Sequence, residues 1–166
     1  MNKRGFTLTE LLAVIVLLGV IALIATPIVL GVIKDSRRNG FSASVNGLKK
    51  AIEADYSDDN FSTNIYYTYG GYSGNPNADT KNTTKKLYRV ENRDSYTRVG
   101  SEISMSGSIN GYGIGHVTSD GVIYVAAFTD EFCAYINNEG VLTTLQIGDE
   151  ITKANCLKKV TDLADW

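Results

Sequence analysis

The chain has 166 residues, which is enough for one globular domain and an additional segment. Its formal net charge of −2 excludes a strongly basic surface, so no specific nucleic-acid partner is predicted. Residues 11–33 carry no charge, whereas the rest is polar and rich in Gly, Ser, Thr, Asn and Tyr. Composition therefore divides the chain into an apolar amino-terminal segment and a polar remainder.

The apolar run is long enough to cross a bilayer once, because a membrane helix needs about 20 apolar residues. Lys3 and Arg4 precede the run and place its amino end in the cytoplasm. A secretory signal would end in a small-x-small site, but bulky Leu23 stands where a small residue is needed before Ala25. We therefore expect a retained single-pass anchor in the cytoplasmic membrane, in contact with lipid, with the carboxy-terminal domain outside.

Glu10 stands at the start of this run, where a carboxylate is costly. Taken alone, it is equally well explained by a position at headgroup level, near the favourable amino end of the helix dipole. The residues before it favour a more specific explanation.

The sequence Gly5-Phe6-Thr7-Leu8-Thr9-Glu10 resembles the prepilin cleavage and methylation motif of type IV pilins and pseudopilins. The resemblance implies that a prepilin peptidase cuts between Gly5 and Phe6, and that Phe6 is then N-methylated. Glu10 would pair with the amino-terminal ammonium of a neighbouring subunit during assembly, since a buried charge is tolerated when a cation neutralises it. Gly19 and Pro27 fall where many members have a helix glycine and a helix proline, and the helix would bend or loosen at Pro27.

The same resemblance implies a non-enzymatic filament subunit that self-associates, with the inner-membrane assembly platform as a further partner and an extracellular filament, or fimbrium, as its destination. Adhesion, motility, DNA uptake and secretion are the possible tasks. Three regions are expected: a leader over 1–5, a transmembrane assembly half-helix over 6–33 and an exported domain over 34–166.

Beyond the membrane segment, helical periodicity continues over residues 34–57. Apolar residues recur on one face at steps of three and four; they are Phe41, Val45, Leu48, Ile52 and Tyr56. We expect one long helix that lays its second half against a sheet, although Asn39-Gly40 leaves a break open.

Residues 58–85 are dense in turn formers and predict an irregular loop. Alternation over Glu102–Ile109 and from Tyr112 to His116, together with the runs Val122–Phe128, Phe132–Asn137 and Val141–Ile147, predicts an antiparallel sheet over about 100–166. The fold class is therefore α+β, with a long amino-terminal helix packed on a small antiparallel sheet, as in pilins.

The chain has two cysteines, Cys133 and Cys156. In an exported domain, one disulfide between a late strand and the tail is the economical interpretation, in a region where many pilins carry such a loop. Two buried free thiols remain the alternative.

No catalytic set is evident in the exported domain. A nucleophilic site would have to depend on the single histidine, His116, for which a surface or packed position is the simpler interpretation. Gly111–Gly115 lacks the spacing of a dinucleotide fingerprint and predicts a flexible or bulged strand entrance. No enzymatic activity is predicted.

Two polar clusters offer oxygen ligands for calcium, and solvated loops are the alternative; they are Asp58-Asp59-Asn60 and the set Asn75, Asn77 and Asp79. No other cofactor or metal is expected. A tyrosine cluster is expected to serve packing or subunit contact before ligand recognition; it comprises Tyr66, Tyr67, Tyr69 and Tyr72.

Three functional hypotheses follow. The first is a pilus-like filament subunit, and the second, from the same family, is a pseudopilin of a secretion or competence system. The third, from another class, is a membrane-anchored surface domain that binds a ligand and never polymerises.

Overall fold

The computed structural model describes residues 5–58, 64–75, 83–92, 97–137 and 139–161. The chain forms two compact units, residues 1–37 and 38–166, and one helix contributes to both. That helix, α1, runs from Leu8 to Asp58 without interruption at Asn39-Gly40, so the predicted continuity is confirmed. Pro27 lies inside α1.

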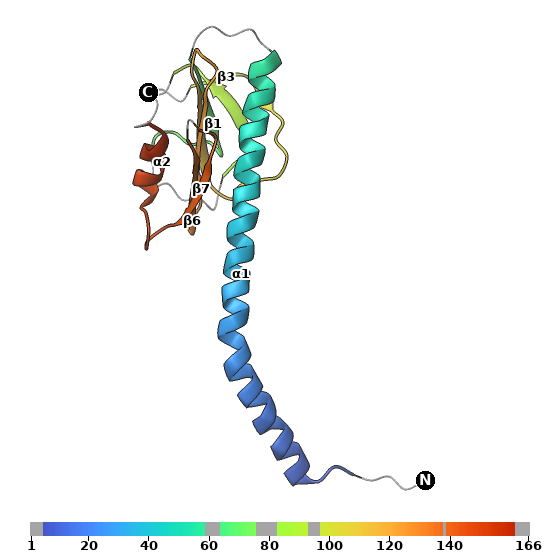
Figure 1. Ribbon diagram of the computed structural model, residues 1–166. Coiled ribbons are helices and arrows are strands. Elements are labelled where there is room, and N and C mark those ends of the chain that lie inside the picture. Colours follow the sequence, from blue (N-terminus) through green and yellow to red (C-terminus); the bar gives the residue numbers. More distant parts are fainter. Residues whose placement is uncertain (1–4, 59–63, 76–82, 93–96, 138, 162–166) are drawn as a thin grey trace. The chain divides into compact units, whose positions relative to one another are not determined.

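The second unit is built on one seven-stranded antiparallel sheet in the order β3-β2-β1-β4-β5-β6-β7 (Figure 1). The strands are β1 (Ile65–Tyr69), β2 (Leu87–Val90), β3 (Arg98–Ile103), β4 (Tyr112–Val117), β5 (Ile123–Phe128), β6 (Phe132–Ile136) and β7 (Leu142–Gln146). A short helix, α2 (Lys153–Thr161), follows. The α+β class is confirmed.

Within this unit the sheet separates two layers. The carboxy-terminal half of α1 covers one face, and α2 covers the other beside β5 and β6 (Figure 1). The predicted apolar stripe of α1 is the face that packs on the sheet: Phe41, Val45, Leu48 and Ile52 are buried, and Tyr56 packs against them partly buried. Burial of this stripe explains why the helix continues beyond the charge-free run.

Two glycines let α1 approach the sheet closely. A Cβ added to Gly113 would lie 3.0 Å from Leu48 Cδ2, and one added to Gly115 would lie 2.4 Å from Ile52 Cδ1. Both glycines belong to β4, which pairs residue by residue with β1 and with β5. The expectation of a flexible or bulged entrance at 111–115 is therefore wrong: from Tyr112 onward the segment is a regular central strand, and its missing side chains make room for the helix.

The predicted loop over 58–85 is wrong in part, because β1 occupies residues 65–69. In β1 every second residue faces α1 and is buried, namely Ile65, Tyr67 and Tyr69. This alternation is short and is surrounded by turn-forming residues, so it was not recognised in the sequence. Tyrosine is a strong strand former, and burial of its ring outweighs the polar surroundings.

The sheet also differs from its predicted range of about 100–166. It begins at β1 and includes β2, whose four residues are too few to show a period. After β7 the chain leaves the sheet and forms α2, so the late tail is helical. The alternation read over Glu102–Ile109 was only partly a strand: β3 ends at Ile103, and Ile109 then packs in the core beneath α1.

Candidate functional site: the start of helix α1

The first turn of α1 is closed by two side chains that bond to each other's backbone. The Thr7 amide donates to Glu10 Oε2 at 2.8 Å, and the Glu10 amide donates to Thr7 Oγ1 at 3.3 Å. The Thr7 hydroxyl also donates to Glu10 Oε2 at 2.8 Å. This reciprocal arrangement is a capping box, in which the residue before the helix and the third helical residue satisfy donors that the helix leaves open.

The capping box fixes where the helix begins. The first helical backbone bond runs from the Leu11 amide to the Thr7 carbonyl, at 3.2 Å. Gly5 and Phe6 therefore precede the helix, and Phe6 is 82% exposed. The peptide bond at the predicted cleavage site thus lies in non-helical, accessible chain, which a peptidase can bind in extended form.

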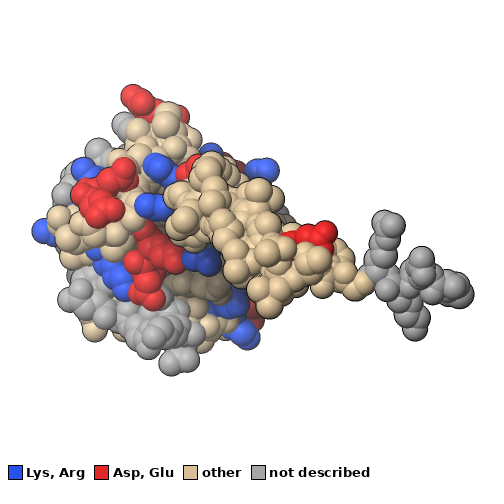
Figure 2. All heavy atoms as spheres, turned by 90° about the horizontal axis from the view of Figure 1, so that it is seen from below, with Lys and Arg blue, Asp and Glu red and all other residues tan. Residues whose placement is uncertain are grey.

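The next part of α1 exposes an uninterrupted apolar surface. From Leu11 to Ile33 its large side chains are exposed, each by at least 43%. No charged residue interrupts this stretch, which lies in the uncharged surface next to the grey amino-terminal residues in Figure 2. Apolar patches of this extent mark membrane or protein contact, and α1 is long and apolar enough to cross a bilayer.

Pro27 interrupts the hydrogen-bond ladder inside this surface. Proline has no amide hydrogen, so it cannot donate to the carbonyl four residues earlier, at Leu23. One residue before it, the Thr26 hydroxyl donates to the Ala22 carbonyl at 2.6 Å, a back-bond typical of bent helices. The backbone is thus locally weakened where the sequence predicts a bend, and the bend itself stays a prediction.

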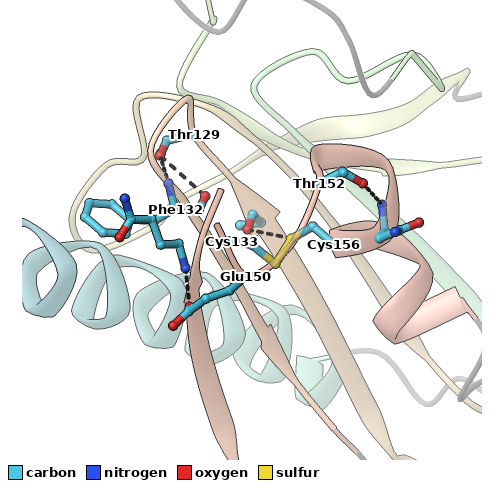
Figure 3. The surroundings of a disulfide bond; sticks show 9 residues. Thr129, Phe132, Cys133, Glu150, Thr152 and Cys156 are labelled. Carbon is cyan, nitrogen blue, oxygen red and sulfur yellow. Dashed lines mark hydrogen bonds between the residues drawn. A yellow bond between two sulfur atoms is a disulfide. The ribbon is translucent and has the colours of Figure 1, made fainter. Parts of the chain in front are cut away.

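Cys133 and Cys156 form a disulfide that joins β6 to α2 (Figure 3). Both residues are fully buried in the layer between the sheet and α2, together with Phe128 and Leu157. The predicted bridge between a late strand and the tail is confirmed, and free thiols are excluded. The bridge therefore joins the short helix α2 covalently to the sheet.

His116 is a core residue and does not line a catalytic cleft. It is 1% exposed, and its ring stacks on Tyr66 at 4.7 Å and on Tyr124 at 6.2 Å. Burial lowers the pKa of His116 to about 4, so the imidazole is neutral at physiological pH. The packed alternative for His116 is the one that the structure shows.

The tyrosine cluster is divided between the two faces of the sheet. Tyr67 and Tyr69 are buried under α1, whereas Tyr72 is buried on the opposite face. Tyr66 lies on that opposite face too, against His116. Packing, which was predicted together with subunit contact ahead of ligand recognition, is the role that the structure shows for these side chains.

The calcium predictions fall mostly outside the described residues. Asp59, Asn60, Asn77 and Asp79 belong to segments that the structure does not describe, and Asn75 is exposed. In the described part of the chain, no group of three acidic, histidine or cysteine side chains is placed to hold a metal ion.

A shallow groove of about 430 Å³ lies between α1 and β3. Asp55 and Arg89 line it and bond to each other, with Arg89 Nε 2.6 Å from Asp55 Oδ2. The same Asp55 oxygen accepts the Tyr67 hydroxyl at 2.9 Å. Burial, together with this bond, raises the pKa of Tyr67. This network ties α1 to β1 and β2, so we assign it to packing of the helix on the sheet.

Taken together, the molecule combines an exposed apolar helix, a capped start with a carboxylate in its first turn, and a disulfide-bonded α+β domain. Residues 1–26 match the family model of the prokaryotic N-terminal methylation motif, which is typical of type IV pilins and pseudopilins. Neither the curated proteins nor the solved structures give a significant match. The chain therefore carries a prokaryotic N-terminal methylation motif at the start of a long apolar helix, in an α+β fold of pilin-like architecture.

Gly5, Phe6 and Glu10 were predicted as site residues from the sequence, whereas Thr7 was not. A signal was present, since Thr followed three residues later by Glu, before an apolar run, is the pattern of a capping box. The structure brings Thr7 and Glu10 into direct contact, next to the predicted cleavage point.

Proposed function

We propose that this protein is the structural subunit of a type IV pilus-like filament, processed by a prepilin peptidase and assembled through its amino-terminal helix. The methylation motif over residues 1–26 carries the proposal. It is supported by the motif's position at the start of a helix whose apolar side chains have no cover within the described residues of the chain.

Processing is the first step. The peptidase cuts between Gly5 and Phe6, which removes Lys3 and Arg4 with the leader and creates a new amine on Phe6. That amine is then methylated. The exposed, non-helical chain at this point supports access by a membrane peptidase from the cytoplasmic side.

Assembly is the second step. In the membrane, lipid covers the apolar surface of α1; in the filament, the helices of neighbouring copies cover it, with the inner-membrane assembly platform mediating the transfer. A carboxylate in such a helix bundle is stable only when it is paired. Glu10 pairs with the Phe6 amine of a neighbouring copy, and the weakened ladder at Pro27 lets the helix adapt to its neighbours.

The location follows from these steps. Before assembly the subunit crosses the cytoplasmic membrane once, with residues 34–166 outside; afterwards it belongs to an extracellular filament. The disulfide suits that exported side, because such bonds persist in oxidising compartments. A pseudopilin of a secretion or competence system would carry the same motif and follow the same steps.

Replacement of Glu10 tests the proposal. Glu10→Ala should leave membrane insertion unchanged but abolish recovery of the protein in sheared filaments. Glu139→Ala is the matched control, since it removes an exposed carboxylate from the turn between β6 and β7. If Glu10→Ala is recovered in filaments like the control, or if the wild type never appears there, the filament role is wrong and a non-polymerising anchored domain is favoured.

A further inference from the structure

Among the described strands, β3 and β7 lie at the two edges of the sheet. The outer side of an edge strand presents backbone amides and carbonyls on which a strand of another molecule can pair. Such pairing joins molecules sheet to sheet, so proteins generally limit it. The two edges of this sheet differ in how they do so.

β3 is irregular and charged. Its register with β2 shifts between Leu87 and Arg89, which marks a bulge. Gly100 has a φ of +77°, and the exposed charges of Arg98 and Glu102 lie two residues before and after it. Bulges and charges are common means by which proteins prevent pairing at a strand edge.

β7 has neither feature. It carries no charge, and it pairs with β6 without a register shift. The Ile147 amide donates to the Glu131 carbonyl at 2.9 Å, and bonded and non-bonded pairs alternate along an antiparallel ladder. Counting from this bond, Leu142, Thr144 and Gln146 direct their amides and carbonyls away from β6, towards the outer edge.

The outward groups of Gln146 are bonded within the turn that follows β7. Its amide donates to Glu150 Oε2 at 2.6 Å, and its carbonyl accepts the amides of Glu150 and Ile151 at 3.2 and 3.3 Å. These bonds agree with the outward direction of Gln146. They leave Leu142 and Thr144 as the residues of β7 on which another strand could pair.

Helix α1 occupies the outer side of Thr144. The Arg38 guanidinium donates through Nη2 to the Thr144 carbonyl. One turn later, the Ser42 hydroxyl lies 2.8 Å from the Thr144 hydroxyl and donates to the Arg38 carbonyl at 3.0 Å. Two side chains of one helix thus hold the same residue, and the outward carbonyl in the middle of β7 is already bonded.

We propose that this edge contact, formed by Arg38, Ser42 and Thr144, is an autoinhibitory contact that prevents two copies of the chain from pairing through β7. The excluded partner is a second copy because it presents the same uncharged, regular strand, so neither charge repulsion nor a bulge would keep the two strands apart. The contact acts on any two copies that meet, so its role does not depend on the proposed filament function.

Replacement of Arg38 tests the proposal. Sedimentation velocity of the full-length protein in detergent micelles, over a concentration series, measures self-association, and any association through α1 is common to all variants. Arg38→Ala should raise the association constant on the order of tenfold, because a charged donor no longer competes for the Thr144 carbonyl. Lys50→Ala is the matched control, since it removes an exposed cation from the same helix, and it should associate like the wild type.

Two further measurements separate strand pairing from a loss of stability. Proline at position 144 has no amide hydrogen, and the Thr144 amide is not part of the ladder with β6. Arg38→Ala combined with Thr144→Pro should therefore associate like the wild type. Hydrogen exchange over Leu142–Gln146 should be slower in associated Arg38→Ala than in the wild type, whereas a merely destabilised protein would exchange faster there.

Association of Arg38→Ala at the wild-type level would overturn the proposal. Association that persists in the variant with Thr144→Pro, or faster exchange over β7 in Arg38→Ala, would overturn it too. If the proline variant does not fold, the exchange measurement on Arg38→Ala decides alone. Failure here leaves the filament role unaffected, because that role is tested separately by Glu10→Ala.

Discussion

Gly47 provides a test in which local helix propensity and tertiary packing predict opposite results. In an isolated helix, alanine is more favourable than glycine by about 1 kcal/mol. In the structure, however, a Cβ added to Gly47 would lie 2.3 Å from the backbone oxygen of Ser106. Relief of this contact requires movement of the chain after β3, where Met105 and Ile109 pack against the core beneath α1.

Overpacking of this kind typically costs about 1–3 kcal/mol. The cost is expected at the upper end here, because the obstacle is a backbone atom that cannot rotate away. The gain in helix propensity offsets part of it. Gly47→Ala should therefore lower the free energy of unfolding by about 1–2 kcal/mol.

Gly40 is the matched control. It lies in the same helix, and a Cβ added there meets nothing within 4 Å. Gly40→Ala should raise the free energy of unfolding by about 0.5–1 kcal/mol. Urea unfolding of both full-length variants in detergent micelles, followed by the near-ultraviolet circular dichroism of the tyrosines, measures the difference. Equal stabilisation by the two alanines would refute the packing of the 104–110 segment against α1.

Two further predictions concern the layer between the sheet and α2. Cys133→Ala with Cys156→Ala should lower the free energy of unfolding by about 3 kcal/mol, because the bridge closes a loop with a separation of 23 residues; an unchanged urea midpoint would show that the bridge contributes no stability. His116 should make stability depend on pH, since its pKa falls from 6.5 in the unfolded chain to about 4 in the folded one. The unfolded chain then binds the proton more readily, so stability is complete above pH 6.5 and falls by at most about 3 kcal/mol as the pH drops to 4. His116→Phe should flatten this part of a pH series of urea midpoints, and an unaltered slope would assign the dependence to other groups.

The amino-terminal segment was predictable because its signals are strong and lie close together in the sequence. A charge-free run, an acidic residue at its start and a basic leader are visible in sequence without knowledge of the fold. The stripe from Phe41 to Ile52 was predictable for the same reason, since a helix of this length repeats its period several times.

The early strands were not predictable, because their signal is short and conflicts with its surroundings. β1 has five residues and is flanked by turn formers, and β2 has four. The place of β1 in the sheet is fixed by pairing with β4, which follows in the chain only after β2 and β3. Local composition contains no information about such partners.

α2 and the role of the β4 glycines were not predictable from local sequence for a second reason. The disulfide and the packing of Leu157 hold α2 on the sheet, and a helix this short is not stable alone. Gly113 and Gly115 weaken a strand when considered locally, yet in the fold they admit Leu48 and Ile52. In both cases the decisive contact comes from another part of the chain.

The proposed function requires that this chain is processed at Gly5-Phe6 and then polymerises. Intact-mass measurement of the protein in sheared, purified filaments tests it most directly. We expect a chain that begins at Phe6, lacks residues 1–5 and carries one added methyl group. A filament fraction without the chain, or a chain that retains Met1 or begins after Ala25, would contradict it.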